Sequence, residues 1–89
     1  MILKIFSLLN CIDCKAYHLL VDQFCKDHKL PYEIVDLDIE EHMDQIIEFR
    51  ITHIPTSIFF NQDTVLCKKG AILTQEDLKA LLNDATLAI

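Results

Sequence analysis

The chain has 89 residues, of which 52% are hydrophobic, and it carries a net charge of −6. This length predicts one domain spanning residues 1–89, with enough apolar content for a core. The acidic balance argues against binding to nucleic acid or to an anionic membrane surface.

Neither a membrane span nor a secretory signal is expected, because no apolar stretch is long enough and the start lacks a basic region. We therefore expect a cytoplasmic protein; a secreted form trimmed of its leader is the alternative. In a reducing compartment, four cysteines are not expected to form structural disulfides. A closely spaced pair among them should be catalytic or metal-binding.

The first half of the chain predicts a strand, a helix and a strand. Residues 2–8 form a nearly continuous apolar run, typical of a strand covered on both faces. The helix that follows has apolar residues at i, i+3, i+4 and i+7. These are Tyr17, Leu20, Val21 and Phe24. Pro31 is expected to end this helix, and residues 32–37 are predicted to form the second strand.

The second half predicts a helix, a hairpin and a final helix. Residues 38–41 supply a cap and an acidic first turn for a helix that extends to about Arg50. Residues 56–60 and 64–68 are predicted to form the hairpin. The inward residues of the first of these helices are expected to be Met43, Ile46 and Ile47.

The last helix has a sequence signal at its start. Thr74 and Asp77 have the spacing of a capping box, and Leu73 and Leu78 that of a hydrophobic staple around it. The buried stripe of this helix is expected to be Leu78, Leu81, Leu82 and Ala85.

The predicted order is therefore β-α-β-α-β-β-α. A right-handed crossover makes the first two strands parallel, and the hairpin adds antiparallel partners. We predict an α/β fold with a four-stranded mixed sheet flanked by three helices.

A cysteine pair lies where the first strand gives way to the first helix, in the segment Asn10-Cys11-Ile12-Asp13-Cys14-Lys15. The free N–H groups and positive dipole end of a helix stabilise a thiolate, which is the nucleophile in disulfide exchange. Cys11, at the exposed lip, is expected to attack, and Cys14, one turn further in, to act in the second step. The alternative is a metal site, although one Cys-x-x-Cys supplies only part of a four-ligand zinc site, to which His18 would add one ligand. The spacing in a chain with a βαβ start favours redox chemistry.

A proline marks the entrance to the third strand, in Ile54-Pro55-Thr56. An ordinary proline in a central strand removes a ladder hydrogen bond. A cis bond before Pro55 would make a sharp turn there instead and would leave the Ile54 backbone free to pair with an extended substrate. A trans proline that ends a loop is the alternative.

Together, the two motifs resemble those of the thioredoxin and glutaredoxin superfamily, and the resemblance covers nearly the whole chain. It implies a thioredoxin fold and a thiol–disulfide oxidoreductase with Cys11 as nucleophile, Cys14 as resolving thiol and Pro55 as cis-proline. Substrates would dock along Ile54 and Thr56, and no metal or organic cofactor is required. The implied partners are proteins that contain disulfides and a reductase or glutathione as electron donor, with the chain acting as a monomer.

Departures from the family patterns leave the subtype open. Ile12-Asp13 stand where thioredoxins usually carry Gly-Pro, and Ile5 stands where they bury an acidic residue. Gly70-Ala71 replace the Gly-Gly pair of glutaredoxins. We favour a thioredoxin-like reductant of protein disulfides. The alternatives are a glutathione-dependent glutaredoxin and a non-catalytic metal-binding or interaction module.

Three charged or titratable residues are expected to tune the pair. Asp13 would raise the pKa of Cys11, since a carboxylate disfavours a nearby thiolate, and would make the pair a better reductant. It opposes Lys15 and the helix dipole, and a protonated His53 would offset it. The alternatives are that Asp13 points into solvent and that His53 is an ordinary surface residue.

The remaining cysteines and histidines have simpler expected roles. Cys25 and Cys67 are predicted to be small buried residues, with a regulatory or dimer-forming thiol as the alternative. His18, His28 and His42 are predicted to be solvated.

Overall fold

The strands form one mixed sheet, and the computed structural model describes all residues from 1 to 89. The strand order is β2-β1-β3-β4. β1 is parallel to β2 and antiparallel to β3, and β3 is antiparallel to β4. The elements are β1 (Ile2–Ser7), α1 (Ile12–Asp27), β2 (Tyr32–Asp36), the 3₁₀ turn η1 (Glu40–His42), α2 (Asp44–Glu48), β3 (Thr56–Asn61), β4 (Thr64–Gly70) and α3 (Gln75–Leu87).

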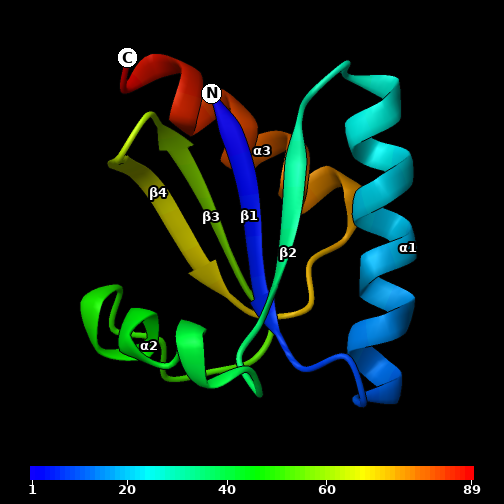
Figure 1. Ribbon diagram of the computed structural model, residues 1–89. Helices are drawn as coiled ribbons and strands as arrows, with labels where there is room; N and C mark the ends of the chain where they lie inside the picture. Colours follow the sequence, from blue (N-terminus) through cyan, green and yellow to red (C-terminus); the bar gives the residue numbers. More distant parts are fainter.

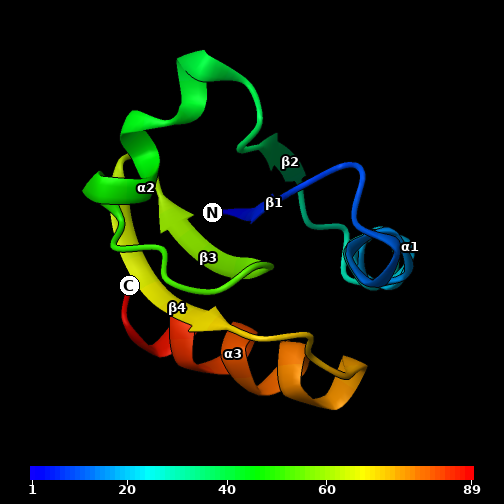
Figure 2. The same ribbon diagram turned by 90° about the horizontal axis from the view of Figure 1, so that it is seen from below.

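The helices cover both faces of this sheet. α1 and α3 lie on one face and α2 lies on the other (Figures 1 and 2). The predicted α/β class, the four-stranded mixed sheet and the three flanking helices are confirmed. No helix is long and apolar enough to cross a membrane.

Alternation along the strands divides the core into two clusters. The larger cluster lies under α1 and α3 and consists of Leu3, Ile5, Tyr17, Val21, Phe24, Cys25, Phe59, Leu73, Leu78 and Ala85. The smaller cluster lies under α2 and consists of Phe6, Val35, Leu37, Ile51, Ile58 and Phe60. Successive residues of β1 and β3 therefore enter opposite clusters, so both central strands are covered on both faces.

The predicted apolar face of α1 is confirmed, because Tyr17, Val21 and Phe24 are buried and Leu20 packs beside them. The end of α1 differs from the prediction. The helix ends at Asp27, before Pro31, because Lys29 adopts a left-handed conformation with φ of 52°. The Leu30 N–H then donates to the Cys25 carbonyl and closes the turn. The backbone reversal, not the proline, ends this helix.

The helix predicted from residue 38 to about Arg50 is present but much shorter than expected. The segment forms the turn η1 and the five-residue helix α2, and neither has a side-chain cap. Met43 is 49% exposed and Ile47 is 82% exposed, so two of the three residues predicted to face inward do not. Only Ile46 of the three packs against the sheet.

Contacts with the rest of the chain fix the end of α2. Arg50 has a φ of 52°, and the Ile51 N–H donates to the Ile46 carbonyl. The Lys68 ammonium of β4 donates to the carbonyls of Phe49 and Arg50 at 2.9 and 3.3 Å. These contacts turn the chain early and bring Phe49 and Ile51 onto the sheet.

α3 begins as predicted. The Thr74 hydroxyl accepts the Asp77 N–H at 3.1 Å, and the Asp77 carboxylate accepts the Thr74 N–H at 3.2 Å, so the capping box is complete. Leu73 and Leu78 are both buried in the larger cluster. This start fixes α3 against the sheet and against α1.

Candidate active site

Two loops meet at one end of the sheet. α1 begins where β1 ends, and Phe6, near that end, is the register partner of Thr56 at the start of β3. The segment before β3 therefore lies at the same end of the sheet as the start of α1, at the bottom of Figure 1. The two sequence motifs are brought together by this register.

Cys11 caps the helix that contains Cys14. Its backbone is extended, with φ of −86° and ψ of 120°, and its sulfur accepts the Cys14 backbone N–H at 3.4 Å. The Lys15 N–H donates to the Cys11 carbonyl at 3.0 Å and continues the helix. The sulfur thus occupies the position of a capping oxygen, where the first turn leaves N–H groups free.

The two thiols differ sharply in exposure. Both are reduced, Cys11 is half-buried, and the Cys14 side chain is only 1% exposed. A disulfide approaching from solvent can therefore meet Cys11 and not Cys14. Cys11 is therefore the accessible thiol of the pair, and Cys14 is the inner thiol.

The pKa of the Cys11 thiol is lowered from its ordinary value. The largest cause is the Cys14 side chain, which hydrogen-bonds to the Cys11 sulfur, followed by the Cys14 backbone. The Asp13 backbone also lowers the pKa, whereas burial and the Asp13 carboxylate raise it. The carboxylate is the smallest of these influences, so the net shift favours the thiolate.

The pKa of the Cys14 thiol is raised. Burial is the largest cause, because a thiolate loses its hydration there, and the hydrogen bond to Cys11 acts in the same direction. A backbone hydrogen bond from Leu8 lowers the pKa by less. The two shifts are opposite, so the proton is held more weakly on Cys11 and more tightly on Cys14.

Lys15 and His53 are not among the main influences on either thiol. Both side chains are exposed. His53 lies against the end of β4, since a Cβ placed on Gly70 would be 3.4 Å from the His53 Cβ. Of the three residues expected to tune the pair, Asp13 is among the influences on the pKa of both thiols, and Lys15 and His53 are not.

The proline loop presents one residue to solvent and hides the next two. The Ile54–Pro55 peptide bond is cis. Ile54 is 44% exposed, whereas Pro55 and Thr56 are buried. The Thr56 hydroxyl donates to the His53 carbonyl, so it stabilises the loop from inside. Of the residues expected to dock substrate, only Ile54 offers its side chain.

Two hydrogen-bonded pairs of side chains, one buried and one partly buried, were not predicted from the sequence. Ser7 Oγ and His18 Nε2 lie 2.5 Å apart, and the hydroxyls of Tyr17 and Ser57 lie 2.7 Å apart. The prediction that His18 is solvated is wrong, because it is half-buried over Ser7, and burial lowers its pKa. Burial raises the pKa of Tyr17 to about 12. The sequence signal for both pairs is a serine within an apolar strand, Ser7 in β1 and Ser57 in β3.

The other two thiols lie away from this end. Cys25 is buried as predicted, and burial raises its pKa to about 11. Cys67 is half-buried in β4, and its thiol donates to the Leu81 carbonyl at 3.3 Å. Burial raises the pKa of Cys67 as well, so both remain protonated thiols at neutral pH.

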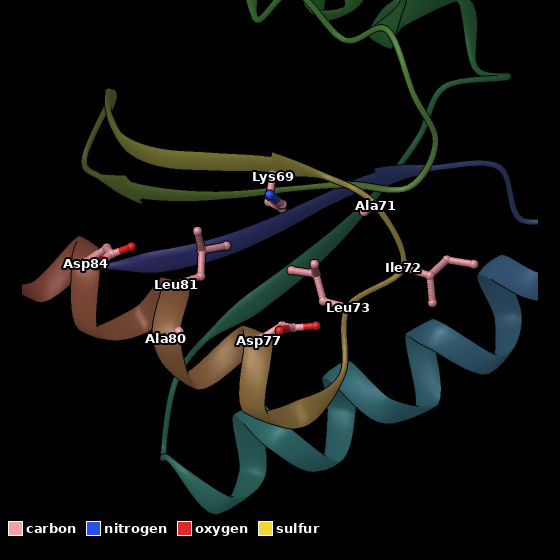
Figure 3. A pocket seen from close by; sticks show the side chains of 8 residues that line it. All are labelled: Lys69, Ala71, Ile72, Leu73, Asp77, Ala80, Leu81 and Asp84. Carbon is pink, nitrogen blue, oxygen red and sulfur yellow. The ribbon is translucent and has the colours of Figure 1, made fainter.

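The largest groove of the surface is separate from the cysteines. It has a volume of about 460 Å³ and lies between the end of β4 and α3 (Figure 3). Its lining residues are Lys69, Ala71, Ile72, Leu73, Asp77, Ala80, Leu81 and Asp84. Neither Cys11 nor Cys14 lines this groove. No group of three or more His, Cys, Asp or Glu side chains is arranged to hold a metal ion.

Solved structures with the same architecture include thioredoxins. One is thioredoxin-2 of the malaria parasite, described as a component of its protein secretion machinery, with 26% identity over 92% of this chain and 80% of that chain, and a TM-score of 0.77. Another is mitochondrial thioredoxin 3 of Saccharomyces cerevisiae in its oxidized form, with 18% identity, coverage of 93% and 76%, and a TM-score of 0.78. Thioredoxin 1 of Thermosipho africanus has 16% identity, coverage of 97% and 99%, and a TM-score of 0.74. No protein-family model and no curated protein matches the sequence.

Proposed function

The chain has the thioredoxin fold, and we propose that it is a thiol–disulfide oxidoreductase that reduces protein disulfides through a reversible Cys11–Cys14 disulfide. One observation carries this proposal. The two sulfurs share the first turn of α1, with the pKa of the accessible thiol lowered and the pKa of the buried thiol raised. This opposition assigns the two steps of disulfide exchange to different cysteines.

The reaction proceeds in two exchanges. The Cys11 thiolate attacks one sulfur of the substrate disulfide, and the other substrate sulfur leaves as a thiolate. Cys14 then loses its proton and attacks the Cys11 sulfur, so that the Cys11–Cys14 bond forms and the second substrate sulfur leaves. The substrate gains two electrons and the protein becomes a disulfide, which an external reductant restores.

Ile54 is the proposed docking residue for the substrate chain. Its side chain is 44% exposed at the end of the sheet that also carries Cys11. An extended segment could add its backbone hydrogen bonds here, in the manner of a strand at an open edge. Pro55 and Thr56 support the loop from the interior. A reducing compartment such as the cytoplasm suits this activity, because electrons leave the dithiol for the substrate.

Insulin reduction tests the proposal. Wild-type protein kept reduced by dithiothreitol should accelerate the cleavage of insulin disulfides, and Cys11→Ala should reduce the rate to that of dithiothreitol alone. Cys67→Ala is the matched control, because it removes a thiol far from the motif and should leave the rate unchanged. Wild-type protein with no effect on insulin cleavage would refute the activity.

The electron donor and the competing functions are separated by two further measurements. Turnover with thioredoxin reductase supports a thioredoxin-like reductant, whereas turnover only with glutathione and glutathione reductase identifies a glutaredoxin.

Metal analysis of protein purified without chelators addresses the binding-module alternative. Bound stoichiometric zinc that is lost in Cys11→Ala, together with no insulin reduction, would replace the proposal by that alternative.

A further inference from the structure

A partly buried hydroxyl–imidazole pair, Ser7 and His18, lies at the end of β1 and has no part in the two exchanges described above. Ser7 is the last residue of β1 and is fully buried, and its hydroxyl is hydrogen-bonded to His18 Nε2. His18 follows Cys14 by one helical turn, and residues four apart share one face of a helix. The backbone of Leu8, the residue after Ser7, lowers the pKa of Cys14, so it lies within reach of this thiol. Cys14 and the Ser7–His18 pair are therefore both placed where β1 ends and α1 begins.

Cys14 requires a nearby group that can accept its proton. A thiol must lose its proton to attack, because the thiolate is the nucleophile. The Cys14 side chain is 1% exposed, so bulk water has almost no access to that proton. Ile5, which points to the same face of the sheet as Ser7, is apolar and cannot accept it. An internal acceptor must therefore lie close to the sulfur.

The charged groups that flank His18 are engaged or face away. On α1, Lys15 is exposed, and Asp22 accepts hydrogen bonds from Tyr32 Oη and forms an ion pair with Lys26. On β2, Asp36 is the register partner of Ser7 and its carboxylate accepts the Asp38 N–H at 3.0 Å. Asp36 is the competing acceptor. His18 differs from it because its ring contacts the buried Ser7 hydroxyl directly.

We propose that the Ser7–His18 pair takes up the Cys14 proton during the second exchange, with Ser7 as the relay and His18 as the final acceptor. This inference rests on the proposed oxidoreductase function. As Cys14 attacks the Cys11 sulfur, its proton passes to Ser7 Oγ, which gives its own proton to His18 Nε2. The Cys11–Cys14 bond forms, the bond from Cys11 to the substrate sulfur breaks, and the imidazolium returns its proton to the departing thiolate. No additional oxidant or reductant is required.

The electrostatics of the pair fit this role. Burial lowers the pKa of His18, so the ring is neutral and able to accept a proton at neutral pH. Burial raises the pKa of Cys14, so the thiol is protonated at rest. The transfer is then confined to the moment of attack, and general-base assistance of this kind typically contributes about 10²–10⁴-fold to a rate.

The test separates the two exchanges in time. Reduced full-length protein is mixed with one equivalent of Ellman's reagent in a stopped-flow instrument. Attack by Cys11 releases the first coloured thiolate, and attack by Cys14 releases the second at a rate independent of protein concentration. His18→Gln, which keeps a hydrogen-bonding side chain, should slow the second phase about tenfold or more and leave the first unchanged.

The pH profile provides a readout that a merely structural role would not change. In the wild type, the second phase should slow as the pH falls through the lowered pKa of His18, because a protonated ring cannot accept a proton. This inflection should be missing in His18→Gln. His28→Gln is the matched control, because His28 lies on the same helix element, at its far end, and should leave both phases unchanged.

Ser7→Ala keeps the test decisive if His18→Gln does not fold, since it removes one buried oxygen; it should also slow only the second phase. Wild-type rates and pH profiles in both variants would overturn the proposal. So would slowing by Asp36→Asn with no effect of His18→Gln. Failure of the oxidoreductase function has a different signature, because the wild type itself would then release one equivalent of coloured thiolate and never the second.

Discussion

The two faces of the sheet are covered to different depths. One face carries α1 and α3, of 16 and 13 residues, over a cluster of ten buried residues. The other carries α2, of five residues, over a cluster of six. We call the face covered by α1 and α3 the thicker face. The hydrogen-bonded pairs that include Tyr17 and His18 both lie on it.

This difference matters for the candidate site. The helix that positions both sulfurs rests on the thicker face, so its first turn is tied to the main core. The loop with Ile54 follows the thinner α2 segment, whose end is held by hydrogen bonds from the Lys68 side chain. The loop that we propose as the docking site is therefore attached to the less extensive side of the core. The predictions below test whether stability and chemistry divide in this way.

The largest expected effect is loss of core packing on the thicker face. Leu78→Ala should lower the free energy of unfolding by about 2–5 kcal/mol, because it leaves a cavity in the larger cluster. Ile47→Ala, on the exposed side of α2, should change it by no more than about 0.5 kcal/mol. Urea denaturation of both variants measures the contrast. Equal losses would show that the burial of Leu78 in the larger cluster is not the cause.

A smaller loss is expected from the buried hydroxyl pair. Tyr17→Phe leaves the Ser57 hydroxyl without its partner in the core, which should cost about 1–3 kcal/mol of unfolding free energy. Tyr32→Phe, which removes a hydroxyl bonded to Asp22 nearer the surface, should cost less. Adding Ser57→Ala to Tyr17→Phe should recover part of the loss. Denaturation midpoints decide, and no recovery would mean that the unpaired hydroxyl is not the cause.

The cap of α3 should contribute less again. Thr74→Ala removes the hydroxyl that accepts the Asp77 N–H, with an expected loss of about 1 kcal/mol. Thr86→Ala is the control, because its hydroxyl donates to the Leu82 carbonyl within the same helix and performs no capping. Thermal unfolding should show a lower midpoint for Thr74→Ala alone. A similar decrease in both variants would assign the effect to threonine in general.

The smallest effects concern the Cys11 pKa, measured as the pH dependence of its alkylation by iodoacetamide. Cys14→Ala should raise this pKa, because it removes the largest influence that lowers it. Asp13→Asn should lower the pKa slightly, since it removes a like charge, and should raise the redox potential of the pair. An unchanged pKa and potential in Asp13→Asn would show that solvent screens the carboxylate.

Local signals in the sequence were sufficient for much of the architecture. The apolar run of β1, the periodicity of α1 and the capping box at Thr74 each depend on neighbours in the chain, and each prediction agrees with the structure. The predicted α2 was too long at its start, because the expected side-chain cap is absent and residues 40–42 form a 3₁₀ turn. Lys68, in a different element, contacts the carbonyls at the end of α2, and periodicity cannot register such a contact.

The sequence by itself determined the order of the elements, the position of both sulfurs at a helix start and the placement of Pro55 before a strand. Only the tertiary structure decided that the net shift in the Cys11 pKa is downward and that His18 meets Ser7. The physical reason is the range of the interactions. Helix periodicity and capping act within a few residues, whereas burial and pairing depend on which strands and helices are brought together.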